Sequence, residues 1–203
     1  MTSDDFGETD GALLRRWQGG DRDAADRLIR RHYAGLSRFF RNKVYHDGED
    51  LLQDTLMRLL DRGRAYTAAA SVRTYLFSIA HNTLIDHLRR RSRRRTVDFE
   101  LDSVTDLGAS PSSVVSRSEV CMRLAQALRR IPVAEQVVIE LAYWEECTLD
   151  EVAEILDIPP GTARSRVRQG RERLLKLMQA NTPTADDAGL ERWLRELRVH
   201  LTE

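Results

Sequence analysis

Cysteine, aromatic residues and long apolar runs are all scarce in this chain of 203 residues. Its two cysteines, Cys121 and Cys147, have no metal-ligand spacing and are too few for a disulfide scaffold. Aromatic residues make up only 6% of the chain, a low fraction that favours helices over a β-sandwich. No apolar run approaches the ~18 residues that can span a membrane, and the polar start MTSDDFGETD is unlike a secretory signal. We therefore expect a cytoplasmic protein with no membrane insertion and no metal site.

Charge is abundant and unevenly placed, although 32 basic residues balance 32 acidic ones. Arginines dominate residues 62–95, which end in LRRRSRRR, whereas residues 96–113 contain four acids and no base. Further along, the stretch IPPGTARSRVRQGRERLL (158–175) carries five arginines and one acid. Segregated charge of this kind indicates surfaces with different partners, and solvated helix faces are the alternative.

Apolar residues recur at helical spacing throughout, and no β-alternation persists, so we predict an all-α fold. A first helical domain is expected over 10–95, with helices near 21–40, 48–63 and 72–91. The helix over 48–63 should bury Leu52, Leu56, Leu59 and Leu60. Residues 96–114 lack a sustained period and read as a flexible acidic linker. A second helical domain should follow over 115–180, and 181–203 form a C-terminal extension.

The second domain contains a helix-turn-helix pattern. Thr148 and Glu151 form a capping box that begins a short helix. Asp157-Ile158-Pro159 turns the chain, and a longer helix should run from about Pro160 to Met178. At 100° per residue, its core side comprises Ala163, Val167, Gly170, Leu174 and Met178.

The opposite side of this helix suits a DNA major groove. Short polar side chains and Arg168 would face base edges, and the flanking arginines would reach phosphates. A surface helix with arginines chosen for solubility is the alternative. The candidate residues for duplex DNA are Thr162, Arg164, Ser165, Arg166, Arg168, Gln169 and Arg171.

Two further stripes lie in the first domain. In GEDLLQDTLMR, the residues Asp50, Gln53, Asp54 and Met57 share one helical face. An acidic face repels phosphate, so it favours a basic protein partner over DNA; a solvated face is the alternative.

The second stripe follows in the next helix, where Tyr75, Ser78, Asn82, Asp86 and Arg89 line up. An aromatic ring beside arginines is suited to holding single-stranded nucleic acid. Asn82 and Asp86 could instead form an i, i+4 hydrogen-bonded pair that fixes the helix.

These motifs resemble the extracytoplasmic-function sigma factors, the small bacterial transcription initiation factors. The resemblance rests on GEDLLQDTLMRL and VRTYLFSIAHNTLIDHLRR in the first domain, and on the helix-turn-helix segment LAQALRRIPVAEQVVIELAYWEECTLDEVAEILDIPPGTARSRVRQGRERL in the second. It covers about residues 10–178 and implies two domains, called region two and region four. It also implies a non-enzymatic subunit with no cofactor, which binds core RNA polymerase and promoter DNA, duplex and melted.

The resemblance assigns the stripes. The face of Asp50, Gln53, Asp54 and Met57 would bind polymerase, and the basic helix would read the minus-thirty-five element. The minus-ten element would be held by Arg73, Tyr75, Asn82, Asp86, Arg89 and Arg90. Whether an anti-sigma factor is a further partner stays open.

Two other function classes fit the sequence less well. An ordinary transcriptional regulator would bind duplex DNA unaided and would not need the acidic face around Asp50. A nucleic-acid enzyme is disfavoured because the sequence has no clustered carboxylates, metal ligands or phosphate loop.

Two features depart from the family pattern. Gln169 stands where similar proteins often place arginine, and Gly170 where they place alanine. The tail is the second departure: Leu190, Trp193, Leu194, Leu197 and Leu201 recur at helical spacing, so an amphipathic helix is expected over 187–201. Its apolar face must be covered, either by simple docking on a domain or by a docking that regulates the two domains.

Overall fold

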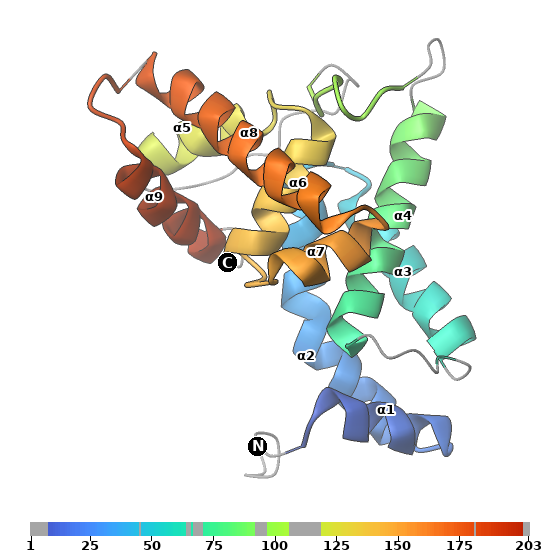
Figure 1. Cartoon of the computed structure of the whole chain (residues 1–203). Coiled ribbons are helices and arrows are strands. Elements are labelled where there is room, and N and C mark those ends of the chain that lie inside the picture. The colour runs from blue at the N-terminus through green and yellow to red at the C-terminus, as the bar shows by residue number, and fades with distance from the viewer. Residues whose placement is uncertain are drawn as a thin grey trace.

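The computed structural model describes residues 8–44, 46–63, 66, 71–91, 97–105, 119–180 and 182–200, and over these residues the fold is all-α, as predicted. The one β feature among them is an isolated bridge between Ser103 and Pro132. Figure 1 shows the helices in two groups, with α1 at the end of the molecule remote from α5 and α9. The helices in chain order are α1 (Asp10–Gln18), α2 (Arg22–Arg41), α3 (Gly48–Arg62), α4 (Val72–Arg91), α5 (Glu119–Leu128), α6 (Val133–Tyr143), α7 (Leu149–Leu156), α8 (Pro160–Gln179) and α9 (Asp187–His200).

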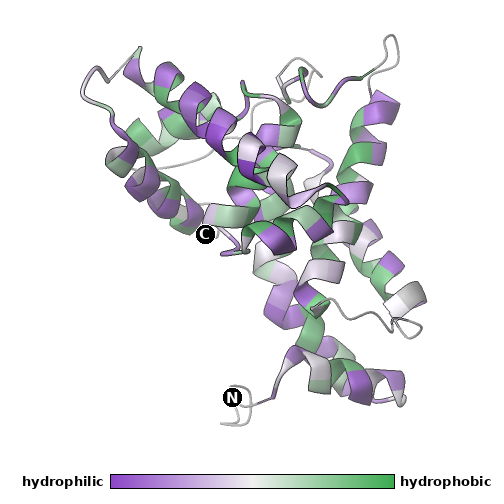
Figure 2. Cartoon of the chain, viewed as in Figure 1, coloured by the Kyte–Doolittle hydropathy of each residue, from purple (hydrophilic) through white to green (hydrophobic). Residues whose placement is uncertain are grey.

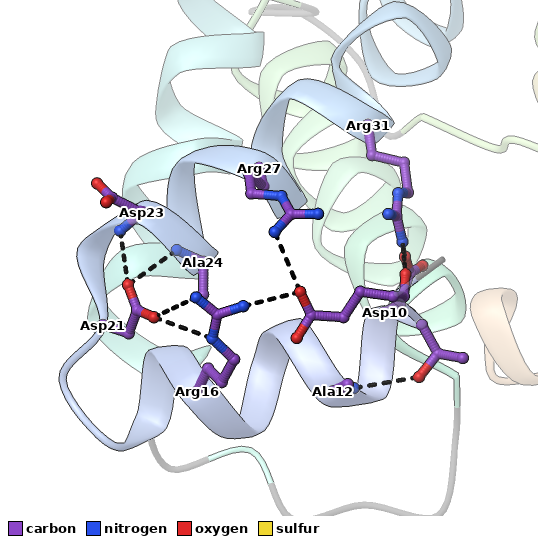
Figure 3. Close-up of polar contacts among 10 residues, drawn as sticks. Asp10, Ala12, Arg16, Asp21, Asp23, Ala24, Arg27 and Arg31 are labelled. Atoms are coloured by element: carbon purple, nitrogen blue, oxygen red, sulfur yellow. Dashed lines mark hydrogen bonds and ion pairs between the residues drawn. The ribbon is translucent and has the colours of Figure 1, made fainter. Parts of the chain in front are cut away.

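The N-terminal domain, α1 to α4, begins with a charged corner between α1 and α2 (Figure 3). Gly20 supplies the positive φ of +101° that the turn requires. Asp21 then caps α2 by accepting the amides of Asp23 and Ala24, and it also pairs with Arg16 at 2.6 Å. These local contacts fix the angle at which α1 lies across α2 and α4.

Helices α3 and α4 complete the N-terminal core. Leu52 and Leu59 of α3 are buried as predicted, and Leu56 is half-buried. The prediction for Leu60 is wrong, because its side chain is 41% exposed. The apolar face of α3 is therefore narrower than the leucine pattern indicates, and Leu60 lies on the outer surface near Met57, which is 58% exposed.

The C-terminal domain, α5 to α9, is built around α6, whose residues Val137, Val138, Ile139 and Leu141 are buried. Helices α7 and α8 pack on α6 and form the helix-turn-helix. The capping box of Thr148 and Glu151 is present, and Asp157 makes the turn with a left-handed φ of +52°. Figure 2 shows hydrophilic residues along the outer surface of α8.

Part of the predicted linker is folded onto the C-terminal domain. Residues 97–105 form turns in which Val104 is fully buried. The amides of Val133 and Ala134 donate to the carbonyls of Asp102 and Phe99, both at 3.0 Å. Residues 106–114 of the linker lie outside the described residues. The acidic segment 97–105 thus belongs structurally to the second domain.

The predicted C-terminal helix is present as α9, and it packs mainly on α5, with further contacts to α6 and α8. Leu190, Leu194 and Leu197 are fully buried, and Trp193 is partly buried. The indole nitrogen of Trp144 donates to the Leu194 carbonyl at 2.9 Å. The tail is therefore a structural part of the second domain.

Candidate nucleic-acid interface

The acidic stripe of α3 lies on the surface, opposite its buried leucines. Asp50 and Gln53 are exposed, and Asp54 is half-buried through a 3.1 Å ion pair with Arg58 one turn on. Met57, on the same face of the helix, is 58% exposed. An exposed methionine ringed by acidic and amide groups is a surface suited to a basic, partly apolar protein partner.

Helix α4 connects to this stripe through one shared arginine. Arg58 also pairs with Asp86 of α4, at 3.6 Å. The exposed carboxylate of Asp86 is thus held towards α3, and Asn82 is exposed one turn earlier. Figure 1 shows α3 and α4 side by side along one flank of the N-terminal domain.

The aromatic residue of the α4 stripe already has a stacking partner. Tyr75 stacks on Tyr66, with ring centroids 4.0 Å apart and planes at 18°. Its backbone carbonyl accepts the hydroxyl of Ser78 at 2.8 Å. A stacked tyrosine pair offers a flat surface of the kind on which an unpaired base can lie.

The arginines of α4 divide into two groups. Arg90 is exposed, and Arg89 lies over the ring of Phe99 at 5.5 Å. Arg73 is half-buried: it pairs with Glu151 at 2.9 Å and donates to the carbonyl of Glu145 at 3.1 Å. Two of the arginines predicted to hold DNA therefore contact the C-terminal domain or the segment packed on it.

The outer face of α8 matches the helical-wheel prediction in part. Arg164, Arg168 and Gln169 are exposed, and Arg168 pairs with Glu172 one turn on. Thr162 is half-buried, and the Ser165 hydroxyl donates to its carbonyl at 3.0 Å. The exposed side chains form a continuous polar surface at the N-terminal half of α8.

Two predicted arginines of α8 are paired within the protein. Arg166 is half-buried and forms an ion pair with Glu100 of the folded acidic segment. Arg171 donates to the Tyr143 hydroxyl at 2.5 Å and pairs with Glu191 and Asp187 of α9 at 2.9 and 3.1 Å. These acids lie 16 to 66 residues away in the sequence, so a helical wheel has no signal for them.

Gly170 is explained by close packing of α8 on α6. A Cβ atom at this position would lie 2.6 Å from Ile139 Cδ1 and 3.2 Å from Glu135 Cβ. The helices approach so closely that no side chain fits between them. Gly170, which departs from the family pattern, therefore allows α8 to pack directly against α6.

Sequence reasoning missed a set of residues where the two domains meet. Helix α4 packs along α7, and the end of α2 lies against α6. A cavity of about 200 Å³ lies between the domains, lined by His81 and Arg89 of α4 together with Phe99, Ile158 and Arg166. Burial and the nearby charges of Lys43, Arg166 and Arg89 lower the pKa of His81 from 6.5 to about 4.

The rest of this contact, which we call the interdomain junction, consists of ion pairs and amides from both domains. Its residues are Arg38 of α2, Asn42 and Lys43 directly after α2, Arg73 of α4, Gln136 and Glu140 of α6, Glu145, and Glu151 of α7. No periodicity marks these residues as partners, because 97 residues separate Lys43 from Glu140.

Comparison with known proteins identifies both domains. Residues 13–94 match the family model "Sigma-70 region 2", and residues 121–174 match "Sigma-70, region 4". The ECF RNA polymerase sigma factor RpoE of Cereibacter sphaeroides is 30% identical over 171 residues, which cover 82% of this chain and 93% of that protein.

Two solved structures have a similar fold. CnrH in complex with the cytosolic domain of CnrY has a TM-score of 0.65 and 22% identity over 86% of this chain and 99% of that one. The sigma factor RpoE in complex with the anti-sigma factor NepR from Bartonella quintana has a TM-score of 0.61 and 20% identity, over 77% of this chain and 97% of that one.

Proposed function

This chain belongs to the extracytoplasmic-function RNA polymerase sigma factors, and on that premise we propose which of its surfaces contacts polymerase and which contacts each promoter element. Such a factor is a non-catalytic subunit that binds core RNA polymerase and directs it to promoters. The N-terminal domain is region 2 and the C-terminal domain is region 4. The observation that carries the assignment is the separation of an acidic surface on α3 from arginine-bearing surfaces on α4 and α8.

The α3 surface binds core polymerase. Asp50, Gln53, Asp54 and Met57 present carboxylate, amide and thioether groups side by side on one exposed face. Such a face repels DNA phosphate and attracts a basic protein surface, while the exposed methionine adds apolar contact.

The α4 surface holds the minus-ten element. Its proposed contacts combine a stacked tyrosine with amide, carboxylate and guanidinium groups: Arg73, Tyr75, Asn82, Asp86, Arg89 and Arg90. A base taken out of the duplex needs an aromatic surface and polar edge contacts, which offset an unstacking cost of a few kcal/mol.

The α8 surface reads the minus-thirty-five element in the major groove. Arg164 and Arg166 lie on the two flanks of the face that would enter the groove, where they would contact phosphates. Arg168 and Gln169 are exposed and would contact base edges. Thr162 and Ser165 lie near the N-terminus of the same helix, joined by a hydrogen bond. Arg171 lies further along α8, where it pairs with Glu191 of α9.

Competition binding to purified core polymerase tests the α3 assignment. Asp54→Arg should lower polymerase affinity, measured by competition binding, while the fold stays intact. Asp26→Arg reverses an exposed acid on α2 outside the proposed surface and serves as the matched control. Equal affinity of both variants and the wild type would show that α3 is not the polymerase surface.

Selection from a randomised duplex pool tests the α8 assignment. Arg164→Ala should weaken binding to all sequences, whereas Arg168→Ala and Gln169→Ala should change which sequence is selected. Lys176→Ala, an exposed cation at the far end of α8, is the control. If every variant selects the wild-type sequence, base reading does not occur through these side chains.

Location and a further partner follow from the same premise. None of the described helices is long and apolar enough to cross a membrane, and a polymerase subunit works in the cytoplasm. An anti-sigma factor is a third partner, supported by the fold that this chain shares with a sigma factor solved in complex with one. Co-expression with candidate partners, followed by a run-off transcription assay, tests it through loss of transcription.

A further inference from the structure

The cavity of about 200 Å³ between the domains, which we call the interdomain cavity, has an apolar interior. Ile85 of α4, Val137 of α6 and Leu156 of α7 line it, and none of them is more than 9% exposed. Phe99 adds an aromatic ring, over which the Arg89 guanidinium lies at 5.5 Å. Because both domains supply its walls, the cavity belongs to the closed arrangement that the structure shows, with regions 2 and 4 in contact.

The volume of the interdomain cavity limits the size of a molecule that could occupy it. An apolar cavity of ~150 Å³ is large enough to hold one benzene molecule, whereas pockets for drug-sized ligands begin at ~300 Å³. About 200 Å³ therefore suits a single ring with one small substituent. A nucleotide or a peptide is too large.

One polar group at this cavity has an unused hydrogen-bond donor. Arg166 of α8 lines the cavity, and its Nη2 pairs with Glu100. Its Nε is buried and has no hydrogen-bond partner among the described residues. A buried N–H group without an acceptor carries an uncompensated cost of dehydration. An oxygen atom of a molecule in the cavity would offset that cost.

The charges around the cavity favour an anion. Glu100 compensates Arg166, whereas Arg89 forms no ion pair with any described residue, so two arginines against one glutamate leave one positive charge. His81, which also lines the cavity, responds to the same surroundings. Burial, and then the positive charges nearby, lower its pKa to about 4, so its ring is neutral near neutral pH.

We propose that the interdomain cavity is a binding site for a small aromatic monocarboxylate, a molecule of about the size and charge of benzoate. The ring would fill the apolar interior beside Phe99, and the carboxylate would accept the Nε–H of Arg166 and pair with Arg89 at the rim. The neutral imidazole of His81 has one N–H that can donate to the same carboxylate. Such binding does not depend on which surfaces contact polymerase and DNA.

Titration of the full chain with sodium benzoate, without DNA or polymerase, tests the site. Amide NMR spectra should show shifts that saturate with a Kd of about 1 mM or tighter. The shifted amides should lie in the segments that line the cavity, around 81–89, 99–100, 133–137, 156–158 and 166.

Three related molecules separate the contribution of the ring from that of the charge. Benzamide has the ring without the negative charge, so it loses the charge-assisted hydrogen bonds and should bind more weakly by about 10-fold or more. Acetate lacks the ring, and benzylamine carries the opposite charge, so neither should produce saturable shifts at these amides. Benzylamine that binds as tightly as benzoate would contradict an anion site.

Two variants change the cavity in different ways. Arg166→Gln removes the positive charge beside the carboxylate and should weaken benzoate binding by about 10-fold or more. Ala134→Leu fills the cavity without changing any charge and should abolish binding. Lys176→Gln removes an exposed positive charge of α8 that does not line the cavity, so it is the matched control and should leave the Kd unchanged.

Two results would overturn the proposal. One is the absence of saturable shifts in the folded wild type, which would mean that the cavity holds water only. The other is equal benzoate affinity in the wild type and both cavity variants, which would place benzoate on the arginine-rich surface instead. Far-UV circular dichroism and the thermal midpoint establish that each variant is folded, and if one cavity variant is not, the other decides the result.

Discussion

Region 4 is covered on two sides, and only one of the two contacts includes a fully buried ion pair. On one side α9 lays Leu190, Leu194 and Leu197 against α5 and its neighbours, all fully buried. On the other side, α2 and α4 of region 2 meet it through ion pairs and amides, and also through apolar side chains such as Ile85 of α4 and Leu156 of α7. Both contacts bury apolar side chains, but only the second also buries an ion pair, whose dehydration costs free energy.

The difference lies in what burial contributes to each contact. Each leucine of α9 gains about 1.5–3 kcal/mol from burial, and together these contributions hold the helix on region 4. The ion pairs of the junction gain little beyond the cost of their dehydration. The tail therefore belongs to region 4.

Removal of residues 182–203 should give the largest effect, on the apolar side of the comparison. The core of region 4 would lose three buried leucines, and the Trp144 indole would lose its acceptor. We expect a strongly lowered thermal midpoint and a loss of transcription. Higher transcription from a protein of unchanged thermal stability would instead make α9 a mask.

A single substitution in α9 tests the same docking with a smaller effect than removal of the helix. Leu194→Ala should cost about 2–5 kcal/mol in the free energy of unfolding of region 4, measured by urea titration. Val199→Ala on the same helix, at a side chain that is 58% exposed, should cost less than about 0.5 kcal/mol. Similar costs for both would contradict the docking of α9.

Acid should act on the polar side of the comparison, through His81. Its pKa is about 4 in the closed structure and near 6.5 when free, because burial and Lys43, Arg166 and Arg89 disfavour its charge; Glu100 lines the same cavity. The open state therefore binds the proton more readily, and closure loses stability as pH falls from about 6.5 to about 4, by at most about 3 kcal/mol.

Scattering across that pH range measures the effect. The radius of gyration of the wild type should increase on acidification, whereas His81→Gln should remove the part of the increase that is due to this residue. Identical pH profiles for the two proteins would mean that His81 does not couple to closure.

Gly170→Ala tests the packing on which α8 depends. The added methyl would lie 2.6 Å from Ile139 Cδ1, so overpacking should cost about 1–3 kcal/mol despite the better helix propensity of alanine. Ile139→Val in the same chain removes that methyl and should recover part of the loss. Gly161→Ala, with nothing within 4 Å of its Cβ, is the control and should not destabilise.

The smallest effect is expected where α9 meets the basic helix. Asp187→Asn with Glu191→Gln frees Arg171 from two partly exposed ion pairs, which contribute under about 1 kcal/mol to stability. Duplex affinity should rise slightly and its salt slope steepen by about 0.9, because one more arginine can reach phosphate. The same changes in an Arg171→Ala background should have no effect on that slope.

The predicted surfaces were accurate where local periodicity governs them. The acidic stripe of α3 is exposed, and Arg164, Arg168 and Gln169 lie on the outer face of α8. The prediction was incomplete for Arg73, Arg166 and Arg171, because each has an acidic partner from another element. A helical wheel predicts the face of the helix on which a side chain lies. The element that this side chain contacts depends on tertiary packing.

The sequence by itself determined the helices, because caps, turns and apolar spacing act over about four residues. The capping box at Thr148, the boundaries of α4 and the amphipathic α9 follow from such local patterns. The same patterns carry the resemblance to the sigma factors. Only the tertiary structure decided that α9 packs on region 4, that Gly170 is needed against Ile139, and that Lys43 meets Glu140. These contacts join residues far apart in the sequence: Gly170 and Ile139 are 31 positions apart, and Lys43 and Glu140 are 97 apart. The packing of whole helices, rather than any local preference, selects such partners.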